Sequence, residues 1–118
     1  MSLLARIVDE LQDDVPIITI EGEIDASNAR DIAGRMRAAL SNHGKALIVD
    51  LTPTTYIDSA GINVLFQLGA ELGERQQELH VVVAPASPIA RMLGIVGLDR
   101  AVRTYPTRAA ALAVVAVQ

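Results

Sequence analysis

The feature that most constrains the fold is a nearly unbroken apolar run at residues 46–51, Ala-Leu-Ile-Val-Asp-Leu. A strand with one face in water alternates apolar and polar residues, whereas a strand covered on both faces is apolar almost throughout. A second run of this kind lies at residues 79–84. Both runs predict central strands of a sheet whose two faces are covered by helices.

Segments with helical spacing separate these strands. Apolar residues recur every three or four positions in residues 29–40 and again in residues 62–72, which predicts two amphipathic helices. Ser27 is the expected N-cap of the first helix, and Gly73 marks the end of the second. A short third helix is expected to begin at Ser87, because serine favours the N-cap and the proline that follows it favours the first helical position.

The two ends of the chain add further elements. Segments rich in β-branched residues at 3–8 and 15–21 predict a hairpin with a loose polar turn over residues 9–14. Residues 101–105 predict a last short strand, and Thr107 is the expected N-cap of a terminal helix. Strands that alternate with helices are joined by right-handed crossovers and lie parallel, so the first hairpin strand is the antiparallel member of the sheet.

Length and composition fit one compact domain. The 118 residues are 51% hydrophobic and 20% charged, within the range of an ordinary globular domain. We expect a single α/β domain over residues 1–118, with a mainly parallel sheet, an antiparallel N-terminal hairpin strand and the order ββαβαβαβα. The chain has no cysteine, which excludes a disulfide framework. Its longest apolar run, residues 109–117, is too short to cross a bilayer, so we expect a cytoplasmic protein without membrane insertion.

The charge balance argues against direct binding to nucleic acid. Fourteen acidic residues outnumber ten basic ones, and Lys45 is the only lysine. With a single Phe as well, the chain offers neither a basic face to follow phosphates nor a set of aromatic rings to stack on bases.

The sequence lacks the motifs of the known phosphate-binding sites. Residues 22–25, Gly-Glu-Ile-Asp, stand where a dinucleotide-binding loop needs G-x-G-x-x-G, and Lys45 lacks the following Ser or Thr of a P-loop. Asp50 ends a central strand, as does the acceptor aspartate of a phospho-acceptor receiver. The acidic pair at residues 13–14 falls in the hairpin instead of after the first parallel strand, and no lysine follows the last strand, so we reject that interpretation.

Classical catalytic and metal sites fail as well. Ser59 does not belong to a G-x-S-x-G nucleophile motif, because Ile57 occupies the position of its first glycine. His43 and His80 are expected at the surface, at the end of the sheet opposite Ser59, where neither can act as its base. Two such histidines and no cysteine make no zinc site. We expect no catalytic residue, no metal and no cofactor.

Two loops at the carboxyl ends of the strands are unusual. One carries Asp25 directly after a strand, and the other, residues 52–61, ends with Asp58 and Ser59 at the start of a helix. Ligands and partners of alternating sheets gather at this edge. Local sequence leaves two interpretations open: Ser59 is an ordinary N-cap beside turn-forming acids, or it is a reactive serine whose small neighbours let a partner approach closely.

Taken together, residues 22–25, 47–51 and 56–62 resemble the STAS domain family of bacterial anti-sigma factor antagonists. The most specific part is the strand ending in Asp-Leu, a spacer and then Tyr-Ile-Asp-Ser-Ala-Gly, which is similar to the family's phosphorylation loop. The resemblance implies that Ser59 is the phospho-acceptor. Many members have a second serine where Ala60 stands. The residues expected to face a partner are Asp25, Asp58, Ala60, Gly61 and Asn63.

The resemblance implies a regulatory protein without catalytic activity. Such an antagonist binds an anti-sigma factor, often an ATP-dependent serine kinase, and thereby frees a sigma factor. Phosphorylation ends the binding, and a metal-dependent serine phosphatase restores it. Two other classes remain open: a constitutive STAS adaptor subunit of a transporter or lipid-transport complex, and an NTP-binding module. Apolar residues crowd the short helix near Gly94, so we also expect some of Met92, Leu93, Ile95 and Val96 to be exposed.

Overall fold

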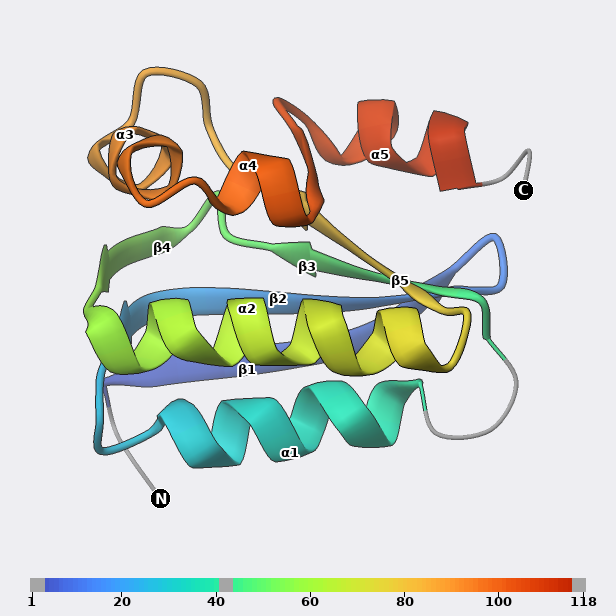
Figure 1. Ribbon diagram of the computed structural model, residues 1–118, viewed down its shortest axis with the longest axis horizontal. Helices are drawn as coiled ribbons and strands as arrows, with labels where there is room; N and C mark the ends of the chain where they lie inside the picture. Colours follow the sequence, from blue (N-terminus) through green and yellow to red (C-terminus); the bar gives the residue numbers. More distant parts are fainter. Residues whose placement is uncertain (1–3, 41–43, 116–118) are drawn as a thin grey trace.

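The computed structural model describes residues 4–40 and 44–115. Within these ranges strands and helices alternate along much of the chain (Figure 1). In chain order the elements are β1 (Ala5–Gln12), β2 (Val15–Ile24), α1 (Ala29–Ala39), β3 (Ala46–Asp50), β4 (Thr54–Ile57), α2 (Ser59–Glu74), β5 (Glu78–Val82), α3 (Pro88–Ile95), α4 (Leu98–Ala101), β6 (Arg103–Tyr105) and α5 (Arg108–Val115).

The sheet is mainly parallel with an antiparallel first strand, as predicted. The structure also contains one strand and one helix that the sequence does not predict. Its strand order is β1-β2-β3-β5-β6, with β1 antiparallel to β2 and the other pairs parallel. The additional strand, β4, pairs in parallel with β2 beyond the end of β3. The additional helix is α4, a single turn that is too short to produce a periodic pattern in the sequence.

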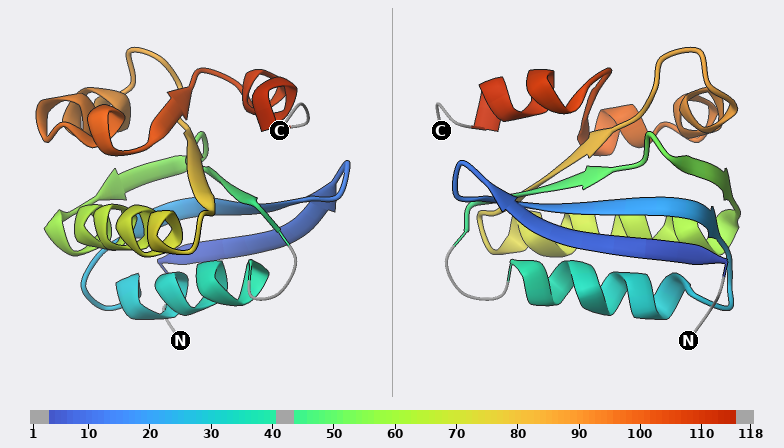
Figure 2. Two further views of the ribbon diagram at one scale, coloured as in Figure 1. Left: turned by 45° about the vertical axis from the view of Figure 1, so that its right-hand side comes forward. Right: turned by 180° about the vertical axis from the view of Figure 1, so that it is seen from behind.

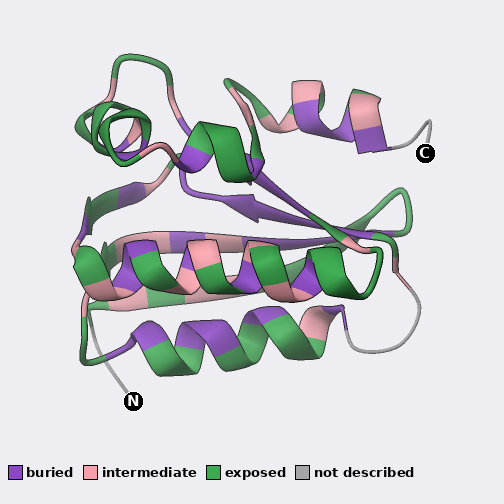
Figure 3. Ribbon diagram, in the orientation of Figure 1, coloured by how far each residue is buried: buried purple, intermediate pink, exposed green. Residues whose placement is uncertain are grey.

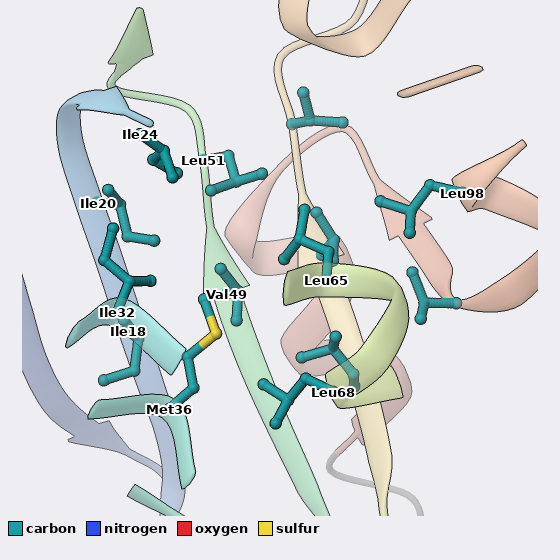
Figure 4. Close-up of a cluster of buried hydrophobic side chains, with 14 of the residues drawn as sticks. Ile18, Ile20, Ile24, Ile32, Met36, Val49, Leu51, Leu65, Leu68 and Leu98 are labelled. Carbon is teal, nitrogen blue, oxygen red and sulfur yellow. The ribbon is translucent and has the colours of Figure 1, made fainter. Parts of the chain in front are cut away.

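Helices cover both faces of the sheet (Figure 2). Ile18 and Val49 lie in the larger core with side chains of α1 and α2 (Figure 4). Ile17 and Ile48, their neighbours along the same strands, lie in a smaller core with α5. Because successive side chains of a strand point to opposite faces, this arrangement explains why β3 is buried at every position.

The hairpin turn is tighter than predicted. β1 continues to Gln12, which pairs with Val15, so only Asp13 and Asp14 form the turn. Both have positive φ, 53° and 65°, as the type I′ turns that favour two-residue hairpins require. The expected loose turn was wrong because the end of β1 is an exposed edge strand, and its polar residues resemble a loop (Figure 3).

The predicted caps of the later helices are confirmed. Ser87 Oγ accepts a hydrogen bond from the backbone N–H of Ala90, and Pro88 is the first residue of α3. Thr107 Oγ1 likewise accepts from the N–H of Ala110 at the start of α5. None of the helices in the described ranges is long and apolar enough to cross a membrane.

Arg108, at the start of α5, ties that helix to three strands. Its guanidinium donates to Asp50 Oδ2 at 3.1 and 3.2 Å, to Glu10 Oε1 at 2.8 Å and to Thr19 Oγ1 at 2.8 Å. Asp50 is buried, and its other carboxylate oxygen accepts two hydrogen bonds from Thr52. Asp50 therefore has a structural role.

The expectation of a surface His80 was wrong. The side chain is fully buried, with Nδ1 2.9 Å from the Tyr105 hydroxyl and Nε2 3.1 Å from Glu78 Oε1. Burial lowers the pKa of His80, and Glu78 opposes this shift only in part. His43 lies outside the described residues.

We predict that Arg108→Met lowers the free energy of unfolding by about 2 kcal/mol, because it leaves the buried Asp50 carboxylate without its counter-charge. Urea denaturation measures the loss. Arg6→Met is the matched control: Arg6 forms an exposed ion pair with Glu21, worth at most about 1 kcal/mol. Equal losses in the two variants would contradict a special role for Arg108.

We predict that His80 makes the protein less stable in mild acid. The folded-state pKa lies below the unfolded value of about 6.5. The unfolded chain therefore binds more protons as the pH falls below that value, and the free energy of unfolding decreases. Urea midpoints of the wild type and His80→Gln at several pH values between neutral and mildly acidic test this. The wild type should lose stability relative to the variant as the pH falls, and a constant difference would contradict the prediction.

Candidate functional site

Pairing of β4 with β2 brings the two unusual loops together. Ile57 lies beside Ile24 in the parallel register, and the backbone N–H of Asp58 donates to the carbonyl of Ile24 at 3.1 Å. The loop that begins at Asp25 and the loop that leads into α2 thus leave adjacent strand ends at the same edge of the sheet (Figure 1). This confirms the expected closeness of the Asp25 and Ser59 loops.

Asp58, and not Ser59, is the N-cap of α2. Its backbone is extended, and Oδ1 accepts hydrogen bonds from the N–H groups of Ala60 at 2.9 Å and Gly61 at 3.2 Å. Ser59 is the first helical residue. Both residue types are good caps, and the sequence gives no signal that separates two adjacent candidates.

This capping leaves the Ser59 hydroxyl available. Ser59 is exposed, and within residues 4–40 and 44–115 its side chain has no hydrogen-bond partner. Asn63 lies one turn further along α2 and is also exposed, while Ala60 is half-buried. A serine at this position can be reached by a partner or modified without removing the helix cap.

Gly61 was expected at the partner-facing surface, but the structure places it in the interior. It is buried, and a Cβ built on it would lie 2.7 Å from Ile24 Cγ2 and 2.7 Å from Ile57 Cγ1. Its missing side chain lets the first turn of α2 pack closely against β2 and β4. Gly61 therefore positions the loop by packing.

The Asp25 turn is held by its own hydrogen bonds. Asp25 Oδ1 accepts from both the backbone N–H and the hydroxyl of Ser27, which together lower the pKa of Asp25. Asn28 is the N-cap residue of α1, so the expected Ser27 cap was wrong. Instead of capping the helix, the buried Asn28 amide bonds backward to the N–H of Asp25 and the carbonyl of Glu23. The turn therefore presents an ionised carboxylate beside the start of α2.

Exposed apolar side chains lie at the same end of the molecule. Met92, Ile95 and Val96 are 37%, 77% and 43% exposed, while Leu93 is buried, which confirms the expectation that α3 keeps part of its apolar surface outside the core. Tyr56 on β4, which packs against α3, is 48% exposed. The sequence predicts a loop over residues 52–61 and gives no signal that Tyr56 lies on a strand.

The described residues contain no cluster of three or more His, Cys, Asp or Glu side chains placed to hold a metal ion. The adjacent ends of β2 and β4 place the exposed Ser59 near the Asp25 turn and next to Asp58, with exposed apolar side chains at the same end of the molecule.

Comparison with known proteins identifies the family. The sequence model of the STAS domain matches residues 6–111. The chain belongs to the STAS domain family. Asp58, which caps α2, and the exposed Ser59 both lie within the matched residues.

Two relatives of this STAS domain are named anti-sigma factor antagonists. The anti-sigma-F factor antagonist RsfB of Mycobacterium tuberculosis is 29% identical over 93 residues, 79% of this chain and 75% of that protein. The anti-sigma-B factor antagonist of Listeria monocytogenes is 33% identical over 82 residues, 70% of this chain and 71% of that protein. Both are named for regulation and not for catalysis.

Solved structures agree. An anti-sigma factor antagonist from Mycobacterium paratuberculosis superimposes with a TM-score of 0.81 at 26% identity, covering 95% of this chain and 94% of that one. The phosphorylated form of the Bacillus cell fate determinant SpoIIAA superimposes with a TM-score of 0.69 at 18% identity, covering 93% and 99%. At that identity SpoIIAA shows the shared fold.

We predict that Asp58→Ala lowers the free energy of unfolding by about 1 kcal/mol, the usual cost of losing an N-cap. Ser59→Ala should change it by no more than about 0.5 kcal/mol, because the hydroxyl caps nothing and alanine favours helices. Thermal or urea denaturation of the two variants side by side decides the point. A loss in Ser59→Ala as large as in Asp58→Ala would mean that Ser59 is the cap.

Proposed function

We propose that this STAS domain is an anti-sigma factor antagonist whose binding is switched by phosphorylation of Ser59. Unphosphorylated, it binds an anti-sigma factor that is also an ATP-dependent serine kinase, and the bound sigma factor is released. Phosphorylation ends the binding, and a serine phosphatase restores it. The observation that carries the proposal is the exposed Ser59 hydroxyl, free of capping duty, in a segment similar to the family's phosphorylation loop.

The position suits a phosphate that changes binding without unfolding the domain. A phosphoserine adds about 1.5 to 2 negative charges near neutral pH. The start of α2 carries the positive end of the helix dipole, which favours an anion there. The cap at Asp58 already satisfies two of the N–H groups, so the phosphate need not replace any native hydrogen bond.

The same phosphate opposes docking of a partner. The carboxylate of Asp58 belongs to the residue before Ser59. The ionised carboxylate of Asp25 follows the end of β2, the strand beside β4. A partner that covers this edge has to remove water from all three charges, and like charges brought together at an interface cost several kcal/mol. The switch therefore acts on the interface.

The exposed apolar side chains next to the Ser59 loop supply contact surface for a partner of the unphosphorylated form. Aromatic residues and methionine are enriched in protein interfaces, and α3 packs against β4, which leads into the Ser59 loop. We define the docking face as seven residues at this end of the molecule: the half-buried Asp25 and the exposed Tyr56, Ser59, Asn63, Met92, Ile95 and Val96.

We predict that Ser59→Asp binds the anti-sigma factor at least about tenfold more weakly than the wild type, a loss of about 1.4 kcal/mol. Ser59→Ala should bind as tightly as the wild type and resist inactivation by ATP. Aspartate near a helix N-terminus is favourable, so the melting temperature should stay the same or rise. Calorimetric titration and thermal denaturation of both variants separate the loss of binding from a loss of folding.

Phosphate uptake distinguishes the switch from a constitutive adaptor. Intact-mass spectrometry after incubation with ATP and the cognate anti-sigma kinase should show one added phosphoryl group in the wild type and none in Ser59→Ala. Ser27→Ala is the matched control, because Ser27 is also exposed and lies in the neighbouring loop. Uptake that persists in Ser59→Ala would move the switch elsewhere. No uptake, with unchanged binding by Ser59→Asp, would make the protein a constitutive adaptor.

A further inference from the structure

An open groove lies between the edge strand β1 and helix α1, outside the docking face. Its volume is about 990 Å³, at the upper end of the range of small-molecule sites. The apolar lining comes from Leu4 before the strand and from Ala5 and Ile7 within it. β1 and α1 lie side by side in both views of Figure 2.

Gly34 keeps the groove open. It lies within α1, lines the groove and is exposed, and a Cβ built on it would meet nothing within 4 Å. Glycine inside a helix is less favourable than alanine. The close packing that explains Gly61 is absent here, so a larger side chain at position 34 has open space beside the groove.

Two arginines of α1 line the groove, one before and one after Gly34 in the sequence. In the described part of the chain, Arg30 and Arg35 have no ion pair or hydrogen bond, in contrast to Arg37 on the same helix, which pairs with Glu71. Both line the groove, together with the single carboxylate of Asp31.

The other two charged residues of the lining neutralise each other. Arg6 forms an ion pair with Glu21 at 3.2 Å. The remaining charged residues of the lining are two arginines, Arg30 and Arg35, and one carboxylate, Asp31. The groove is therefore positively charged, although the formal net charge of the chain is -4.

We propose that this groove binds a single acyl chain with an anionic head group. The chain lies along the apolar surface of Leu4, Ala5 and Ile7, and the head group is bound by Arg30 or Arg35. Arginine suits this role because its planar guanidinium forms paired hydrogen bonds with carboxylate or phosphate. A free fatty acid and an anionic lipid drawn from a membrane share this chemistry.

Titration with cis-parinaric acid, a fluorescent fatty acid, tests the site. We expect saturable binding to the full chain, displaced by dodecanoate and not by dodecyltrimethylammonium, which has the same tail and the opposite charge. Gly34→Leu should weaken binding at least about tenfold, because the new side chain fills the groove, while its melting temperature rises as helix propensity improves. Ala38→Leu is the control, since Ala38 is an exposed residue of α1 that does not line the groove.

The charge requirement is tested separately. Arg30→Gln and Arg35→Gln should weaken binding of dodecanoate and leave displacement by the uncharged dodecanol unchanged. Binding to phosphatidylglycerol vesicles that Gly34→Leu abolishes would identify a membrane lipid as the source of the chain, and binding of the free acid alone would identify a free fatty acid. Wild-type affinity in Gly34→Leu, or absence of saturable binding, would overturn the proposal, and so would displacement by an unrelated extended peptide that pairs with β1.

Discussion

The parallel pairing of β4 with β2 is the interaction on which the functional edge of the molecule depends. Beyond the end of β3, β4 becomes the neighbour of β2. The Thr54 hydroxyl stabilises this pair by donating to the carbonyl of Ile20 at 2.7 Å. Gly22, with a φ of 105°, lies at the register shift of this pair, a conformation that favours glycine. Without this pairing, the Asp25 turn and the start of α2 would leave the sheet at different heights.

Capping divides the work between two adjacent residues. Asp58 caps the first turn of α2, so the Ser59 hydroxyl is not needed as the helix cap. Gly61 brings that turn against β2 and β4. The rigid part of the site thus lies beneath the surface, and its chemistry and charge lie on it. A change of charge at Ser59 can then act on binding while the core keeps its packing.

Sequence reasoning succeeded where a pattern has one physical cause. The apolar run at residues 46–51 is typical of a strand covered on both faces, and Ser87 followed by proline marked a helix start correctly. It failed where tertiary context decided. β4 was missed because Thr54 follows a proline in a turn-like cluster, and the Asp13 turn because an exposed edge strand is polar. His80 was expected at the surface because its hydrogen-bond partner, the Tyr105 hydroxyl, is distant in sequence and lies beside the ring only in the folded chain.

The footprint of the anti-sigma factor on this protein, mapped by amide chemical-shift changes in solution, tests the account most directly. We predict changes at Ser59 and Asn63, at the Asp25 turn and along the exposed side of α3, and their disappearance when Ser59 is phosphorylated while the remaining spectrum stays that of the folded domain. A footprint confined to α5 or to the β1 edge, or one that phosphorylation leaves in place, would contradict it.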